Sequence, residues 1–245
     1  MRYLILSDIH ANWEALAAVL EHVEGSYDRI CCLGDLVGYG ADPNRVVDWA
    51  RENCAEIIRG NHDRACCGLE DPVLFNPVAQ AAVQWSLGEI TPDNGEYLRG
   101  LRAGPLDVGD FILVHGSILD EDRYLLDVED AASQFPHMPG RLAFFGHTHV
   151  QGGFFQRAVG ANSDGDAPKL ESAEFRFGEG DAGLVNPGSV GQPRDRNWEA
   201  ACALYDAGSR TVRYHRTPYD IEAAQAKIIA AGLPRALAER LSLGR

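Results

Sequence analysis

The chain repeats one pattern that limits its fold: a short apolar run that ends in aspartate, asparagine or histidine. Five such runs occur, at residues 3–6 before SDIH, 30–33 before GD, 57–59 before GNHD, 111–114 before HG and 142–145 before GHTH. Short apolar runs rich in β-forming residues predict buried strands. We therefore expect five strand ends to direct polar side chains toward one rim.

Helical segments separate the early strands. Asn12 is a predicted helix cap, because apolar residues follow it at helical spacing. A second helix is predicted from Asp42-Pro43 to about Asn53, with proline at its first position. This alternation of strands and helices predicts parallel pairing, with the helices over the outer face of the sheet.

Two longer segments follow the GNHD motif. Residues 64–105 are predicted to form a mainly helical insertion that borders the rim, with helices at 77–87 and 92–101. Residues 117–140 form a second insertion, in which the stretch FPHMPG at 135–140 is predicted to be a loop.

The last third of the chain has a different periodicity. Residues 174–177 and 211–214 alternate with a period of two, which predicts antiparallel strands in a second sheet. The acidic, glycine-rich stretch 160–168 is a predicted exposed tip. A C-terminal helix is predicted to stop at Gly232 and to resume at Pro234.

Composition argues against several classes of protein. The 22 basic and 36 acidic residues give a net charge of −14, which argues against duplex nucleic acid or an anionic membrane as a partner. The six cysteines form no CxxC pair, which favours buried thiols in a reducing compartment over disulfides. With no secretory leader, membrane span or interdomain linker in the pattern, we expect one cytoplasmic α/β domain over residues 1–245.

The motifs DIH at 8–10 and HTH at 147–149 each hold two potential metal ligands. In extended chain, residues two apart project to the same side, so each motif would offer two converging ligands. Carboxylate oxygen with imidazole nitrogen suits Mn, Fe, Zn, Co or Ni rather than calcium. The candidate ligands are Asp8, His10, Asp35, Asn61, His115, His147 and His149. Seven ligands exceed what one ion uses, so we expect two divalent transition-metal ions that share a bridging carboxylate.

The ordered motifs SDIHAN, GDLVGYG, GNHD, VHG and GHTH resemble those of the calcineurin-like metallophosphoesterases. The resemblance spans about residues 3–195, and NPGSVGQPR at 186–194 is similar to the small prokaryotic phosphodiesterase branch. It implies two packed mixed β-sheets flanked by helices, in a four-layer α/β/β/α sandwich. It also implies one ion held by Asp8, His10, Asp35 and His149, and another held by Asp35, Asn61, His115 and His147.

The resemblance and the ligand chemistry together predict a metal-dependent phosphoric ester hydrolase. Two divalent ions convert a bridging water to hydroxide for in-line attack on phosphorus, so no protein nucleophile is needed. The expected substrate is a phosphodiester or a nucleotide-like small phosphate ester. His62 is expected to assist the leaving group, with Asp63 orienting its ring.

The second motif departs from the protein serine/threonine phosphatase branch, in which it is GDxVDRG. Gly38 and Tyr39 stand in place of that aspartate and arginine, and the loss of this phosphate clamp argues against a phosphoprotein substrate. The arginines that are candidates to replace it are Arg59, Arg64, Arg123, Arg194 and Arg196. Arg194 is the predicted substrate contact, and Asn12, mainly a helix cap, is a second candidate.

Two other functions stay open at this stage. A dinucleoside polyphosphate hydrolase is the nearest alternative, because the insertion at 64–105 can supply a base-binding wall. A non-catalytic protein-binding scaffold is the other, since a relative in membrane-coat assembly resembles this fold but lacks the histidine of GNHD. His62 is retained here, which favours catalysis. The sequence leaves the native metal and the oligomeric state undetermined.

Overall fold

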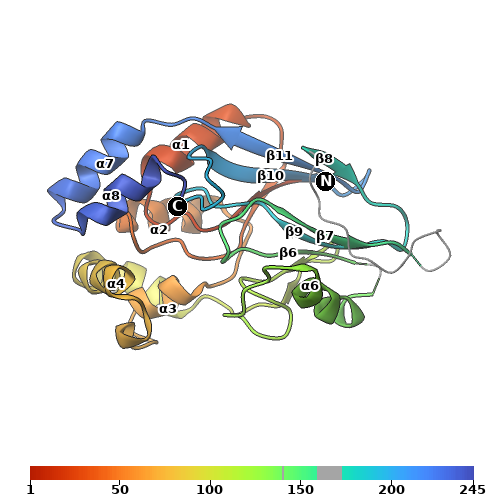
Figure 1. The fold of residues 1–245 in the computed structure, drawn as a ribbon, viewed down its shortest axis with the longest axis horizontal. Coiled ribbons are helices and arrows are strands. Elements are labelled where there is room, and N and C mark those ends of the chain that lie inside the picture. Colours follow the sequence, from red (N-terminus) through yellow and green to blue (C-terminus); the bar gives the residue numbers. More distant parts are fainter. Residues whose placement is uncertain (140, 159–172) are drawn as a thin grey trace.

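The computed structural model describes residues 1–139, 141–158 and 173–245, and shows two mixed β-sheets packed face to face with helices on both outer sides (Figure 1). The first sheet has the strand order β3-β2-β1-β10-β11-β8, and the second has the order β4-β5-β6-β9-β7. The first contains β1 (Arg2–Leu6), β2 (Arg29–Cys32), β3 (Glu56–Ile57), β8 (Glu174–Arg176), β10 (Ala200–Asp206) and β11 (Thr211–Thr217). The second contains β4 (Leu106–Asp107), β5 (Ile112–Leu113), β6 (Leu142–Phe144), β7 (Gly152–Gln156) and β9 (Ala182–Asn186). The predicted architecture is confirmed.

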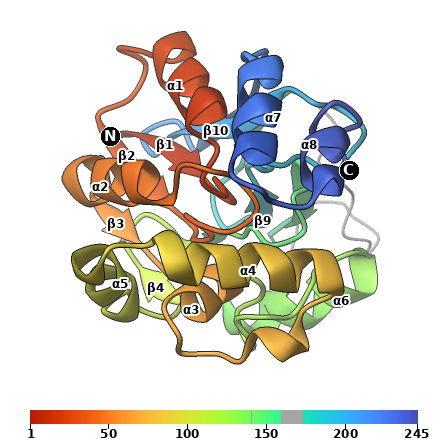
Figure 2. The ribbon, with the colours of Figure 1, turned by 90° about the vertical axis from the view of Figure 1, so that its left-hand side faces the viewer.

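Parallel pairing brings the polar motifs to one edge of the sandwich. β1 pairs in parallel with β2, and β2 with β3, while β5, β6 and β9 form a parallel set in the second sheet. The carboxyl ends of parallel strands lie at the same edge of a sheet, which is where open α/β sheets bind ligands. Figure 2 shows the molecule from this end, with α4, α7 and α8 toward the viewer.

The strands predicted over residues 174–177 and 211–214 do not belong to the second sheet. β11 pairs antiparallel with β10 and β8, and β10 pairs antiparallel with β1, so these strands extend the first sheet. A two-residue alternation predicts which face of a strand is buried, but it carries no information about which strand lies beside it. The predicted antiparallel pairing is confirmed, but the predicted assignment of these strands to a second sheet is wrong.

Four helices, those that follow Asn12, Asp42, Asn76 and Thr91, begin where the sequence predicts, whereas the two helices at 61–66 and 128–134 were not predicted. The helices nearest the first sheet are α1 (Trp13–His22), α2 (Pro43–Asn53), α7 (Ile221–Ala230) and α8 (Arg235–Leu241). The others are α3 (Asn61–Cys66), α4 (Pro77–Glu89), α5 (Pro92–Arg99) and α6 (Val128–Gln134), with 3₁₀ turns η1 (Pro72–Leu74) and η2 (Phe135–His137). The side chain of Asn12 accepts a hydrogen bond from the backbone N–H of Ala15, which confirms it as the cap of α1.

The predicted loop at 135–140 is wrong at its start, because Phe135–His137 forms η2 directly after α6. Proline is compatible with the first turn of a helix, so Pro136 does not force a loop. Gly140 and the predicted tip at 160–168 lie outside the described residues. No helix in the described part of the chain is long and apolar enough to cross a lipid bilayer.

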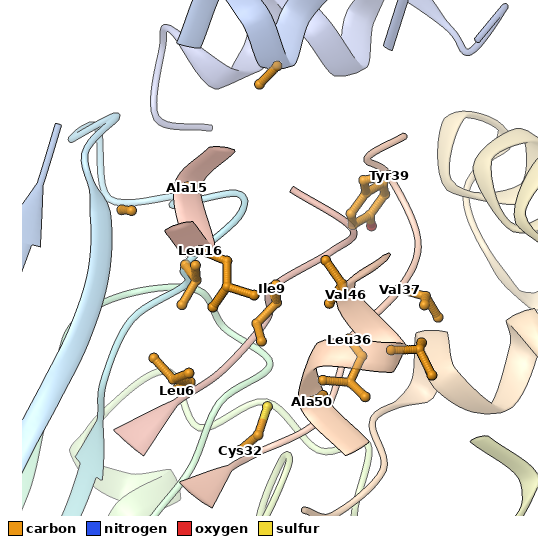
Figure 3. Packing of buried hydrophobic residues seen from close by; sticks show 14 of the residues in the cluster. Leu6, Ile9, Ala15, Leu16, Cys32, Leu36, Val37, Tyr39, Val46 and Ala50 are labelled. Carbon is orange, nitrogen blue, oxygen red and sulfur yellow. The ribbon is translucent and has the colours of Figure 1, made fainter. Parts of the chain in front are cut away.

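Side chains alternate between two core layers along β1. Tyr3 and Ile5 pack between the sheets, whereas Leu4 and Leu6 pack under the helices that cover the first sheet. Figure 3 shows part of the core layer under these helices, which includes Leu6 and Tyr39. A third cluster lies between the second sheet and α6. Apolar contacts on both faces therefore hold the strand ends rigidly, which positions the polar side chains at the rim.

Candidate metal centre

The polar motifs leave their strands in the left-handed backbone conformation. Five candidate ligands have positive φ: Asp8 at 53°, His10 at 49°, Asp35 at 54°, His147 at 64° and His149 at 59°. β1 ends at residue 6 and β6 at residue 144, so these residues lie beyond the strands. The prediction that extended chain makes the ligands converge was therefore wrong, because left-handed turns do so. Such conformations are unfavourable for residues with a Cβ and cluster at functional sites.

One group of ligand atoms comes from Asp8, His10, Asp35 and His149. All four side chains are buried, and one ligand atom of each lies within 4.8 Å of those of the others. Nε2 of His149 lies 3.3 Å from Oδ1 of Asp8, and Nε2 of His10 lies 3.6 Å from Oδ2 of Asp35. The geometry matches the first ligand set that the family resemblance implies.

A second group contains Asp35, His115 and His147, with ligand atoms again within 4.8 Å of one another. Oδ2 of Asp35 lies 3.5 Å from Nε2 of His115, and Oδ1 of Asn61 lies 3.3 Å from the same nitrogen. Since Oδ2 of Asp35 is close to a histidine of each group, Asp35 lies between them. The fold thus brings all seven candidate ligands together.

The hydrogen bonds of the imidazole rings define which nitrogen is available to a cation. Nδ1 donates to a backbone carbonyl in three rings: His10 to Val37 at 2.9 Å, His115 to Leu33 at 2.8 Å and His149 to Gln192 at 2.6 Å. A carbonyl only accepts, so Nε2 of each neutral ring carries the lone pair. Nε2 of His10 and Nε2 of His149 lie 3.2 Å apart. Two lone pairs at this distance, beside carboxylates, fit a shared divalent cation.

Burial raises the pKa of the two carboxylates in the first group, which a bound cation would reverse, and lowers the pKa of its two histidines. Desolvation raises the pKa of Asp8 to about 7 and raises the pKa of Asp35, which also lies near the charge of Asp63. Desolvation lowers the pKa values of His10 and His149 well below the usual range, so both rings are neutral. Histidine binds a metal as neutral imidazole, and aspartate binds it as a carboxylate. The rings are therefore already in the metal-binding state, and a cation would stabilise the charged form of the carboxylates.

Asp63 holds the backbone around Asp35. Its Oδ2 accepts from the backbone N–H groups of Asp35 at 2.8 Å and Gly60 at 3.0 Å, and its Oδ1 accepts from Leu36 at 2.8 Å and Val37 at 3.3 Å. The carboxylate is fully buried, and neither oxygen has a hydrogen bond to the ring of His62 within the described structure. The predicted role of Asp63 in orienting His62 therefore has no contact to support it, and Asp63 instead positions Asp35.

His62 follows Asn61 in the first turn of α3 and lines the pocket beside the ligands. Its ring contacts those of His10, Tyr39 and Phe75, with centroid distances of 4.9, 4.4 and 4.9 Å. A Cβ at Gly38 would lie 2.4 Å from Nδ1 of His62, and Gly38 has a φ of 85°. Glycine at position 38 is therefore required both by the positive φ of the backbone and by the close approach of the His62 ring. This explains the departure from GDxVDRG at that position.

A pocket of about 390 Å³ opens onto the second group of ligand atoms. Its lining residues are Tyr39, Asn61, His62, Glu70, Phe75, Asn76, Asp122, Tyr124, His147, Arg194 and Arg240. The ring of Tyr124 stacks on that of His147, with centroids 4.0 Å apart. Phe75, Tyr124 and Arg240 belong to no sequence motif, so their place in the pocket was not predicted. The predicted C-terminal helix, which resumes at Pro234, was the one signal near Arg240, and a helix alone does not indicate a functional site.

The arginines that were candidates for phosphate binding differ in their partners. Arg59 pairs with Glu121 at 2.9 Å, and Arg123 pairs with Asp130 at 2.9 Å. Arg194 lines the pocket and donates to the hydroxyl of Tyr39 at 3.3 Å.

Asn12, the other predicted substrate contact, uses both polar atoms inside the fold. Its Oδ1 accepts from Ala15, and its Nδ2 donates to the carbonyl of Gly191 at 2.9 Å. It is absent from the pocket lining, so we assign Asn12 to the fold and do not retain it as a substrate contact.

Comparisons with known proteins agree with this geometry. Residues 1–209 match the calcineurin-like phosphoesterase superfamily domain, and the chain belongs to this family. The crystal structure of a metallophosphoesterase from Sphaerobacter thermophilus is similar, with a TM-score of 0.86 and 38% identity over 100% of this chain and 99% of that chain. A hypothetical protein from Pyrococcus horikoshii shares the fold, with a TM-score of 0.79 and 20% identity over 100% and 98% of the two chains.

A curated relative extends the likeness to the whole chain. An uncharacterized protein from Methanocaldococcus jannaschii is 35% identical, over 98% of this chain and 97% of its own length. The predicted family is confirmed. This family depends on divalent metal ions, and the structure has clusters of histidine and aspartate side chains that could bind them.

Proposed function

We propose that the protein hydrolyses small phosphate esters with two divalent transition-metal ions. Asp8, His10, Asp35 and His149 would hold one ion, and Asp35, Asn61, His115 and His147 the other. The position of Asp35 carries the proposal, since its Oδ2 lies within 3.6 Å of Nε2 of a histidine in each group. When bound, the ions supply positive charge for the phosphoryl oxygens and lower the pKa of water.

Arg194 would bind a phosphoryl oxygen beside the ions. Its backbone N–H donates to the carbonyl of His149 at 3.1 Å, which fixes the residue next to the first ligand group. Its Nε is buried without a partner among the described residues. A guanidinium in this state gains most from a charge-assisted hydrogen bond with phosphate.

His62 would assist the leaving group by donating a hydrogen bond to the leaving oxygen. Its Nδ1 is buried without a partner among the described residues, and desolvation lowers the pKa of the ring well below its usual value. A neutral ring with its proton on Nε2 would donate from that nitrogen to a substrate in the pocket that His62 lines. Donation at this point stabilises charge as it develops on the leaving group.

The substrate would be a phosphodiester or a nucleotide-like ester. A pocket of about 390 Å³ fits a small ligand and is too small for a folded phosphoprotein domain. Phe75 and Tyr124 supply aromatic surface at its wall, which suits a nucleobase. Phe75 comes from the segment 64–105, and this contact also keeps a dinucleoside polyphosphate hydrolase as a second candidate.

The test is an activity panel on protein of known metal content. With manganese added, turnover of bis-p-nitrophenyl phosphate, p-nitrophenyl phosphate and diadenosine tetraphosphate separates diester, monoester and polyphosphate hydrolysis. We expect turnover of at least one ester, lost on chelation and restored by metal. Equal background rates for the parent and for His62→Ala on every ester would overturn the proposal and favour the non-catalytic scaffold.

A further inference from the structure

The pocket contains charges of both signs, and its carboxylates and arginines differ in their partners. The carboxylates of Glu70 and Asp122 are both paired with Arg64, through Nη2 at 2.7 Å in each case. Arg194 and Arg240 have no side-chain carboxylate within ion-pairing distance in the described part of the chain. The wall therefore carries two guanidinium groups that pair with no carboxylate side chain of the described residues, in a chain whose net charge is −14.

These two guanidinium groups share one aromatic ring. The Cζ atoms of Arg194 and Arg240 each lie 5.8 Å from the ring centroid of Tyr39. Arg240 uses Nε to donate to a backbone oxygen of Arg245, which leaves its two Nη atoms without a recorded acceptor in the described structure. Burial and the charge of Arg194 together lower the pKa of Arg240. The two like charges repel each other, and a bound anion would relieve the repulsion.

Arg240 is held toward the pocket by the packing of α8. Leu237, Ala238 and Leu241 are buried in the core with α7, which fixes the rotation of the helix. Figure 2 shows α8 at the same end of the molecule as α4, the end that carries the metal-ligand groups. The match to the superfamily domain ends at residue 209, so Arg240 comes from a part of the chain that the common domain does not include.

We propose that Arg240, together with Arg194, binds a second phosphate group of the substrate, so that the pocket selects esters with two phosphates over esters with one. The proposal rests on the function proposed above and deepens it: Arg194 and Arg240 line the same pocket as Asn61 and His147, so an ester with one phosphate at the ligand groups keeps its second phosphate within reach of this pocket wall. Two forked guanidinium groups offer several N–H donors, which matches the three terminal oxygens of a phosphate. The substrate class is then a bisphosphorylated small molecule, such as a nucleoside bisphosphate.

The first test measures binding without turnover. Manganese-loaded protein is titrated with a non-hydrolysable bisphosphonate analogue of adenosine 3′,5′-bisphosphate by isothermal titration calorimetry. We expect Arg240→Gln to weaken binding at least about tenfold, as expected for a lost charge-assisted contact. Arg235→Gln is the matched control, because Arg235 lies on the same helix with an exposed side chain, and it should change affinity by less than about twofold. Unchanged affinity in Arg240→Gln would overturn the proposal.

The second test measures selectivity in the manganese-loaded enzyme. We expect Arg240→Gln to raise KM for adenosine 3′,5′-bisphosphate about tenfold and to leave kcat/KM for adenosine 5′-monophosphate within about twofold. Equal losses for both ligands would show that Arg240 does not recognise a second phosphate. If the parent binds the bisphosphate through Arg240 but hydrolyses no ester, the subsite stands and the phosphoesterase proposal fails. If the parent hydrolyses esters and Arg240→Gln changes neither binding nor KM, the phosphoesterase proposal stands and the subsite proposal fails.

Discussion

Asp63 is the residue for which the structure and the sequence predict different roles, and Asp63→Asn separates them. In the structure, each carboxylate oxygen accepts two backbone N–H groups. An asparagine oxygen can retain two of these bonds, but its NH₂ group would face the other two donors. The variant therefore loses two buried bonds around Asp35 and creates a repulsive contact.

The magnitude follows from the number of bonds. Each hydrogen bond to a charged group contributes about 1.5–3 kcal/mol, so two losses amount to roughly 3–6 kcal/mol. Burial raises the pKa of Asp63, so relief of an unfavourable buried charge offsets part of this loss. We expect the free energy of unfolding to fall by about 3 kcal/mol. Metal affinity should fall about 10–100-fold, as is usual when a support of a ligand is removed.

Urea unfolding of the metal-free protein and metal titration measure these two quantities. Asp48→Asn is the matched control, because Asp48 is exposed on α2, and its effect should stay within about 0.5 kcal/mol. The reasoning is refuted if Asp63→Asn keeps the stability and metal affinity of the parent and loses only kcat. That result would support the role in orienting His62 that the sequence predicted.

Four further outcomes are expected. His62→Ala should lower kcat about 10²–10⁴-fold with the metal content unchanged, measured by steady-state kinetics and elemental analysis; loss of metal instead would contradict a role outside the ligand set. Gly38→Ala should also lower kcat, because its Cβ would meet Nδ1 of His62 at 2.4 Å, and a parent-like rate would show that the ring has room to move. Arg194→Gln should weaken phosphate-ester binding by about 1.5–3 kcal/mol in KM-based comparisons, with unchanged KM as the contrary result. Chelation should lower the free energy of unfolding by about 2.7 kcal/mol for each ion present at 100 times its Kd, and an unchanged denaturation midpoint would count against resident ions.

The positions of the metal-ligand candidates could be predicted from sequence because they depend on a short-range pattern. An apolar run followed by Asp, Asn or His places a polar side chain at a strand end, and parallel pairing gathers the strand ends. The local geometry of these residues could not be predicted. Asp8 and His149 adopt positive φ, which an isolated residue with a Cβ disfavours and which only the surrounding structure stabilises.

The contacts made over long sequence separations were also beyond the pattern. Arg240 reaches the pocket through the packing of a C-terminal helix, and β8 and β11 join the first sheet by pairing with strands distant in sequence. Asp63 adjoins His62 in sequence, which suggested a contact, but its oxygens face the backbone at 35–37 and at Gly60. None of these contacts follows from a periodic pattern in the sequence, so none could be predicted from it.

The most direct measurement is anomalous X-ray diffraction from crystals of the protein loaded with manganese. The account predicts two peaks, one on each side of the Asp35 carboxylate, with one near Nε2 of His10 and His149 and the other near Nε2 of His115. In crystals of Asp35→Ala, both peaks should weaken together. A single peak, or peaks that leave Asp35 uncoordinated, would contradict the account.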